Sequence, residues 1–204
     1  NDMPALIAQA QGHVLEAYPQ YWALSRQLND ARAPVPEAAL RAFMDRYRAT
    51  YLAERLRNDW ILAADRRDDS SAVLALERTG LPTSQVGCAI VRARHMHREN
   101  VAREALAAFS PGEACWLMYT QLVNDGALRW QDLAPQLREM IESAASANEI
   151  ANAKRMAEYV FDTPGRAAFS QLMENPMTWL VRQDTPVSAT DRELVVLALA
   201  RLAR

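Results

Sequence analysis

The sequence has few of the residues that build phosphate, cofactor or metal sites. It contains 6 glycines, 2 cysteines and 3 histidines among 204 residues. The glycines stand singly, so there is no G-x-G-x-x-G or Walker-type loop, and no Gly-x-Ser-x-Gly elbow marks a nucleophile. No apolar run approaches the roughly 20 residues that cross a bilayer, and the net charge of −2 lacks the basic excess of nucleic-acid-binding domains. We therefore expect no cofactor, no nucleic-acid partner and no membrane span.

The residues that are present are typical of a folded helical protein. Hydrophobic residues make up 50% and charged residues 24% of the chain, which excludes disorder as a description of the whole. The strong helix formers Ala, Leu, Arg, Glu and Gln are abundant, whereas β-branched residues are scarce. Of the 23 basic residues only Lys154 is a lysine, an arginine bias that genome composition explains as readily as function. Composition thus indicates a helix-rich globular protein and does not name a function.

Capping residues divide the chain into short helical segments. Pro36 opens one segment, Thr50 can cap the next, and Asp69 or Ser70 and then Thr190 can cap later ones. Apolar stripes recur at helical spacing: Leu52-Leu56-Trp60-Ala63, Leu133-Leu137-Ile141 and Ile150-Ala153-Ala157-Val160. This pattern predicts about a dozen helices of roughly 8 to 17 residues, joined by short connections.

Two arrangements can bury so many short amphipathic helices: a globular bundle, or a solenoid of stacked helix pairs. A bundle around one core favours fewer and longer helices, so we expect the solenoid, although no strict tetratricopeptide repeat is present. The predicted fold is therefore an all-α superhelix that spans residues 1–204 as a single domain.

Cys88 and Cys115 form the candidate covalent link of the chain. They fall in the predicted helices 84–100 and 111–124, with one short helix between them. Because stacked helix pairs place a helix beside the second one after it, the two thiols can meet. In an oxidising compartment the pair is a candidate disulfide, whereas in a reducing one both residues are ordinary small apolar side chains. The residues alone leave both interpretations open.

No other residues assemble a catalytic or metal site. His95 and His97 lie two positions apart, whereas a helical metal pair needs a spacing of three or four, so we interpret them as surface residues. The tryptophans occupy apolar helical positions typical of core packing, and the alternative is that an exposed one stacks on a sugar. They are Trp22, Trp60, Trp116, Trp130 and Trp179. We expect no catalytic residue, metal ligand or cofactor-binding residue in this chain.

Several segments spread over most of the chain share a pattern of helix boundaries with one known family. They are Tyr18-Pro19-Gln20-Tyr21-Trp22 continuing to Gln27-Leu28, residues 37–47, 52–60 and 62–68, Gly112-Glu113-Ala114-Cys115-Trp116, and Asp125-Gly126-Ala127-Leu128-Arg129-Trp130. Together they resemble the helical, non-catalytic region of the soluble lytic murein transglycosylases. Members of that family can carry a cysteine pair at the positions of Cys88 and Cys115.

The resemblance implies a longer, periplasmic parent enzyme. Such enzymes cleave the β-1,4 bond between N-acetylmuramic acid and N-acetylglucosamine in peptidoglycan and leave 1,6-anhydromuramoyl ends. One glutamate of a lysozyme-like C-terminal domain acts as acid and then as base, without a metal, and an α-superhelix supports that domain. The family signature is Glu-Ser followed by Gly-Leu-Met-Gln, but Glu142-Ser143 continues as Ala144-Ala145-Ser146 and no Gly-Leu-Met-Gln is present. No catalytic residue carries over, and we place Glu142 on the solvent side of its helix.

Two functions from different classes follow. The first is the non-catalytic superhelical domain of a periplasmic lytic transglycosylase, inactive alone. Its partners would be the missing catalytic domain and, through an arginine-bearing surface, the glycan strands of peptidoglycan. The alternative is a free-standing α-solenoid adaptor that binds proteins. The start at Asn1 and the apolar run 194–204 without a C-cap lead us to expect a piece of a longer chain.

Overall fold

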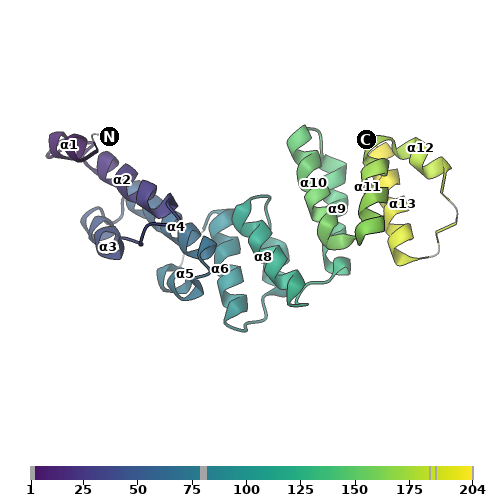
Figure 1. Cartoon of the computed structure of the whole chain (residues 1–204), viewed down its shortest axis with the longest axis horizontal. Coiled ribbons are helices and arrows are strands. Elements are labelled where there is room, and N and C mark those ends of the chain that lie inside the picture. Colours follow the sequence, from purple (N-terminus) through teal and green to yellow (C-terminus); the bar gives the residue numbers. More distant parts are fainter. Residues whose placement is uncertain (1–2, 79–81, 184, 187, 204) are drawn as a thin grey trace. The chain divides into compact units, whose positions relative to one another are not determined.

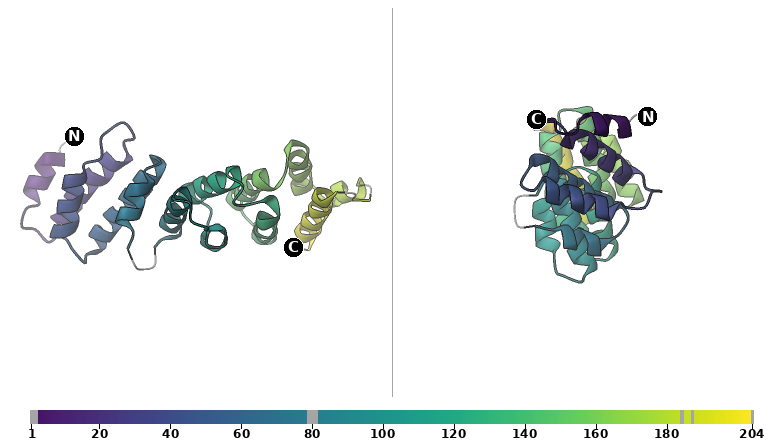
Figure 2. Two further views of the ribbon diagram at one scale, coloured as in Figure 1. Left: turned by 90° about the horizontal axis from the view of Figure 1, so that it is seen from below. Right: turned by 90° about the vertical axis from the view of Figure 1, so that its left-hand side faces the viewer.

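The structure is a computed structural model that describes residues 3–78, 82–183, 185–186 and 188–203. This part of the chain contains thirteen α-helices and no strand (Figures 1 and 2), which confirms the predicted all-α, solenoid-like class. The helices are α1 (Met3–Gln9), α2 (Ala17–Asn29), α3 (Glu37–Arg46), α4 (Tyr51–Arg66), α5 (Ser70–Leu76), α6 (Ser84–Met96), α7 (Ala102–Ala108), α8 (Glu113–Asn124), α9 (Trp130–Ser143), α10 (Ala147–Val160), α11 (Thr163–Glu174), α12 (Pro176–Val181) and α13 (Ala189–Leu202). Within the described ranges, none of them has the length and apolarity that a membrane crossing requires.

Side-chain caps explain where several helices begin. Thr50 and Asp69 each accept a hydrogen bond from the backbone N–H three residues later, at 3.3 and 3.0 Å, so both predicted caps are confirmed. The prediction for Thr190 is wrong, because Ser188 caps α13. The Ser188 hydroxyl accepts from the Asp191 N–H, and the Asp191 carboxylate accepts from the Ser188 N–H, both at 3.0 Å. This capping box starts the helix before Thr190.

The chain divides into two compact units, Asn1–Met118 and Tyr119–Arg204, with the boundary inside α8. In the first unit α4 contacts α2, α3, α5 and α6, and α6 in turn contacts α5 and α7. A helix that contacts both the next helix and the one after it is typical of a stacked solenoid. The prediction of a single superhelical domain over residues 1–204 stays a prediction.

Helix α4 supplies the centre of the first unit's core. Its predicted apolar stripe is buried, with at most 8% of any member exposed: Leu52, Leu56, Trp60 and Ala63. Burial of each large apolar side chain contributes about 1.5–3 kcal/mol. Polar contacts add to this packing, because the Tyr21 hydroxyl of α2 donates to the Asp59 carboxylate of α4 at 2.8 Å and accepts from Arg55 Nε at 2.7 Å. The apolar stripe and these bonds together hold α2 on α4.

The second unit is organised around α9, α11 and α13. Helix α9 contacts α10 and α13, and α11 contacts α10, α12 and α13. The core side chains are at most 1% exposed: Leu133, Leu137, Ile141, Ala153, Met156, Ala157, Phe169, Leu172 and Leu197. Both predicted stripes therefore face the core, except that Ile150 is half-buried. The nearly buried carboxylate of Glu193 on α13 accepts from Arg138 Nε on α9 at 2.7 Å, a charged hydrogen bond that holds these two helices together.

Candidate functional site

The structure brings together the two cysteines singled out from the sequence. Cys88 on α6 and Cys115 on α8 are joined by a disulfide, with their Cα atoms 4.9 Å apart, and both side chains are fully buried. The amide of Gln85 lies beside the bridge, with its Nε2 3.4 Å from Cys115 Sγ. The same Nε2 donates to the Ser110 carbonyl, and Oε1 accepts from the Ala114 N–H, both at 3.1 Å. The bridge and these hydrogen bonds hold the start of α8 against α6.

The other polar candidates from the sequence are exposed or half-buried. His97 is exposed, with Nε2 3.2 Å from the Ser70 hydroxyl, and His95 is half-buried. Within the described residues, no group of three or more His, Cys, Asp or Glu side chains is placed to hold a metal ion. Glu142 is exposed on α9, as predicted, and the hydroxyl of its neighbour Ser143 donates to a backbone carbonyl of the same helix. The prediction that these residues carry no catalytic or metal-binding role stays a prediction.

The tryptophans separate into buried and exposed members. Trp60, Trp116 and Trp179 are at most 7% exposed, and Trp130 is half-buried. Trp22 on α2 is 50% exposed. Its ring lies edge-to-face with that of Tyr18, one helical turn earlier, with 6.1 Å between the ring centroids. Core packing thus accounts for three of the five, and Trp22 meets the condition set for the sugar-stacking alternative.

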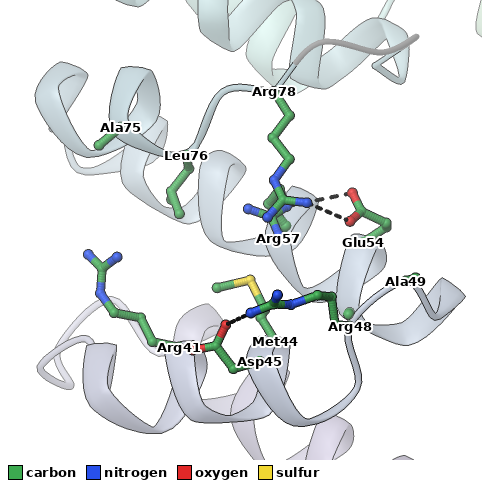
Figure 3. Close-up of a pocket in the computed structure, with 11 residues that line it drawn as sticks. Arg41, Met44, Asp45, Arg48, Ala49, Glu54, Arg57, Ala75, Leu76 and Arg78 are labelled. Carbon is green, nitrogen blue, oxygen red and sulfur yellow. Dashed lines mark hydrogen bonds and ion pairs between the residues drawn. The ribbon is translucent and has the colours of Figure 1, made fainter.

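Sequence reasoning missed a pocket in the first unit that is lined by four arginines (Figure 3). Its walls come from α3, the α3–α4 turn, α4, the end of α5 and the segment that follows α5. The lining residues are Arg41, Met44, Asp45, Arg48, Ala49, Ala53, Glu54, Arg57, Ala75, Leu76 and Arg78. The pocket volume is about 190 Å³, below the roughly 300–1,000 Å³ of drug-sized ligand sites. It therefore suits a small group, or one end of a longer ligand.

The turn between α3 and α4 forms one wall of this pocket. Ala49 has a φ of 64°, in the left-handed region, and this backbone conformation lets the chain reverse within four residues. Thr50 then caps α4 and starts the new helix at once. The reversal places Arg48, in the turn after α3, and Glu54, in the first turn of α4, on the same pocket.

The residues that line the pocket carry an excess of positive charge. Four arginines face two carboxylates, Asp45 and Glu54, so the formal charge of the lining is +2. Arg48 Nη2 lies 3.3 Å from Asp45 Oδ1. Glu54 is shared, with Oε2 3.6 Å from Arg57 Nε and Oε1 3.6 Å from Arg78 Nη1. An anion is the ligand that such a lining favours.

Arg57 differs from the other three arginines in its burial. Its side chain is 11% exposed, against 59% for Arg78, 61% for Arg41 and 76% for Arg48. The Nε atom of Arg57 is buried and has no hydrogen-bond partner. A buried guanidinium whose donor is unmet is costly in the free protein, and a ligand oxygen that accepts from it recovers part of that cost.

A second pocket of about 220 Å³ lies near the disulfide, beside Gln85, Gly112 and Asp65. Burial raises the pKa of Asp65, while the guanidinium of Arg92 opposes that shift. Asp65 Oδ1 already accepts from Arg92 at 3.0 Å, whereas Oδ2 is buried without a partner. We interpret Asp65 as a structural ion-pair partner because its charge is already matched inside the protein.

Comparisons with protein-family models, with curated proteins and with solved structures give no significant match to this chain.

Proposed function

We propose that this chain is the non-catalytic α-superhelical domain of a periplasmic soluble lytic murein transglycosylase. In that role it contributes binding, while a lysozyme-like domain of the parent enzyme cleaves the β-1,4 bond of peptidoglycan to give 1,6-anhydromuropeptides. The all-α fold supports the proposal, as does the Cys88–Cys115 disulfide, a bond typical of oxidising compartments such as the periplasm.

The observation that carries the proposal is the arginine-lined pocket. Peptidoglycan is rich in carboxylates, because its peptide stems carry them. A lining with a formal charge of +2 attracts such groups, and guanidinium forks match carboxylate geometry. Three of the four arginine side chains are more than half exposed, so a polymer can reach them without entering a deep cleft. Each exposed contact contributes under about 1 kcal/mol, which gives weak, multivalent attachment to a long polymer.

The experiment is co-sedimentation of the chain with purified peptidoglycan sacculi, followed by analysis of released muropeptides. We expect binding without release of 1,6-anhydro products. The double variant Arg48→Gln, Arg78→Gln should weaken binding about tenfold. The control Arg103→Gln, Arg192→Gln removes the same charge from exposed residues outside the pocket and should bind like the unmodified chain. Absence of sedimentation, or equal losses in both double variants, would overturn the proposal.

A free-standing adaptor is the second candidate, and one observation favours it. Helix α13 exposes Val196, Leu199 and Leu202, at 41%, 54% and 38%, each three positions after the one before it along one side of the helix. Exposed apolar stripes of this kind are typical of protein-binding helices. The sacculus experiment separates the two functions, because a protein adaptor has no reason to sediment with peptidoglycan.

A further inference from the structure

We infer that the arginine-lined pocket is a carboxylate receptor in which Glu54 holds the anion position until a ligand carboxylate replaces it. The inference rests on the proposed function only for the source of that ligand, the free carboxylates of peptidoglycan stem peptides. The receptor itself follows from the geometry of Arg57, Arg78 and Glu54.

The Glu54 carboxylate is too far from its two arginines to hydrogen-bond to either. It lies 3.6 Å from Arg57 Nε and 3.6 Å from Arg78 Nη1, whereas charged N–H···O bonds are about 2.7–2.9 Å long. Figure 3 shows both ion pairs converging on this one carboxylate. Glu54 therefore balances charge at the site without satisfying the donors, and Arg57 Nε in particular has no hydrogen-bond partner.

Glu54 can leave the site at little cost. Its side chain is 51% exposed, so water can take over its carboxylate when it turns outward. Neither of its two ion pairs reaches hydrogen-bond distance, and the pair with Arg78, whose side chain is 59% exposed, contributes little. Its small neighbours Ala49 and Ala53, which also line the pocket, leave room beside it.

A ligand carboxylate can form the hydrogen bonds to the guanidinium groups that Glu54 does not form. A ligand is not bound by the helical backbone that fixes the Cα of Glu54 three residues from that of Arg57, so it can approach the guanidinium groups to hydrogen-bond distance. Because Arg57 is nearly buried, that bond forms where water competes least. The position between the two arginines is already occupied by the carboxylate of Glu54. A ligand that replaces it is therefore expected to present a carboxylate as well.

The decisive variant is Glu54→Gln, which removes the competing charge and keeps the shape of the side chain. We expect it to bind a soluble stem tetrapeptide with free carboxylates about fivefold more tightly than the unmodified chain does, measured by isothermal titration calorimetry on the full chain. The matched control Glu158→Gln changes the net charge equally at an exposed residue of α10 and should leave the affinity unchanged. An unchanged or weaker affinity of Glu54→Gln would overturn the inference.

Variants of the two arginines test the same site from the other side. Arg78→Gln, at a 59% exposed residue, should fold normally and lose at least half of the affinity. Arg57→Gln should bind more weakly still, and circular dichroism checks that this nearly buried position still folds. If Arg78→Gln binds the peptide as tightly as the unmodified chain, the inference is wrong.

Three further ligands decide between sources of the anion. The same peptide with its carboxylates amidated should not bind, and equal binding would overturn the receptor. Inorganic phosphate should bind more weakly than the peptide, and tighter binding would overturn the preference for carboxylates. An ordinary L-peptide with a free C-terminus that binds as well as the stem peptide would support the receptor and overturn the peptidoglycan source. If the chain binds the stem peptide but does not bind sacculi, the proposed function is wrong and the carboxylate receptor stands.

Discussion

Arg92 on α6 donates from Nη1 to both the backbone carbonyl and the carboxylate Oδ1 of Asp65 on α4, each at 3.0 Å. Only 6% of Arg92 and 4% of Asp65 is exposed. Arg92 also pairs through Nη2 with Asp68, in the turn that follows α4. These bonds tie two stacked helices of the first unit together by charge as well as by apolar packing.

Removing the guanidinium should therefore destabilise the first unit strongly. We expect Arg92→Gln to lower the free energy of unfolding by about 3–5 kcal/mol, because it leaves the Asp65 charge buried without its partner. Urea denaturation followed by circular dichroism measures the change. Arg103→Gln, at an exposed arginine of α7, should change the free energy of unfolding by less than about 0.5 kcal/mol. If both substitutions change the free energy of unfolding equally, the buried Arg92–Asp65 pair contributes no more to stability than an exposed arginine does.

The titration of Asp65 should contribute to the pH dependence of the free energy of unfolding. Its pKa in the folded protein is raised above the ordinary 3.8, chiefly by burial and against the pull of Arg92. A raised pKa means that the folded state binds the Asp65 proton more tightly than the unfolded state does. The stabilising contribution of Asp65 is then complete below pH 3.8 and is lost as the pH rises through the folded pKa.

The comparison with Asp65→Asn isolates this contribution, because all other carboxylates titrate in both proteins. We subtract the free energy of unfolding of Asp65→Asn from that of the unmodified chain. This difference should fall as the pH rises from acidic to neutral. Urea denaturation at a series of pH values measures it. A difference that grows with pH would mean that Arg92 outweighs burial and that the folded pKa is lowered.

The disulfide should dominate the response of the first unit to reductant. Closing 27 residues between Cys88 and Cys115 lowers the entropy of the unfolded chain and stabilises the fold by about 3.5 kcal/mol in the simple chain model. Chain produced in an oxidising compartment should be lighter by two hydrogen atoms than the reduced chain in an intact-mass measurement, and reduction should lower its midpoint in urea. The Cys88→Ala, Cys115→Ala variant should be insensitive to reductant. An unchanged mass after reduction would count against both the bridge and the periplasmic proposal.

Substitution by alanine should destabilise the protein at Gly112 and stabilise it at Gly87. A Cβ atom at Gly112 would overlap the amide of Gln85, which is held by hydrogen bonds to Ser110 and Ala114. Gly112→Ala should therefore lower the free energy of unfolding by about 1–3 kcal/mol as those bonds are lost.

Gly87 is the matched control, because it lies within α6 and a Cβ there would meet only Pro82 Cγ, at 3.9 Å. Gly87→Ala should raise the free energy of unfolding by about 0.5–1 kcal/mol through helix propensity. Thermal unfolding of both variants measures the contrast. If Gly112→Ala stabilises as much as Gly87→Ala does, Gln85 is free to move and its bonds contribute little.

Exposure of Trp22 provides a test of the sugar-stacking prediction. Trp22 is 50% exposed, whereas Trp60 is 3% exposed, so Trp22→Phe should remove much of the iodide-quenchable fluorescence and Trp60→Phe very little. If Trp22 stacks on a sugar, an uncharged N-acetylglucosamine oligomer should shift the emission to shorter wavelength and protect it from iodide. Trp22→Phe should abolish that shift. Emission that does not respond to the oligomer would leave Trp22 without a sugar-binding role.

Local features of this fold could be predicted from the sequence because their causes are local. Thr50 and Asp69 cap their helices through backbone groups three residues away, and apolar stripes such as that of Leu56 and Trp60 follow from helical geometry alone. The prediction failed at Thr190, where Ser188 competes for the same role and the Asp191 side chain decides between them. Two capping candidates that lie two positions apart can be separated only when the side-chain partner of each is considered.

The candidate site could not be predicted in the same way. Arg41, Arg48, Arg57 and Arg78 are spread over 37 positions and share no motif, and the arginine bias of the whole chain concealed them. The number of arginines could be counted in the sequence. Which of them is buried, and that Arg78 reaches Glu54, depends on how α3, α4 and α5 pack. The distinction between Trp22 and the buried tryptophans has the same origin, since all occupy helical positions with apolar neighbours.

Helical periodicity and capping residues were enough to predict the all-α class, most helix boundaries, and the apolar faces that those helices bury. Backbone hydrogen bonds, caps and helical periodicity act within a few residues, so they can be deduced from neighbouring letters. Helix packing had to be known to establish that Cys88 meets Cys115, that Arg92 is buried on Asp65, and that four arginines line one pocket. Those relationships join residues about 24 or more positions apart or on different helices, and packing of whole helices sets their distances and their access to water.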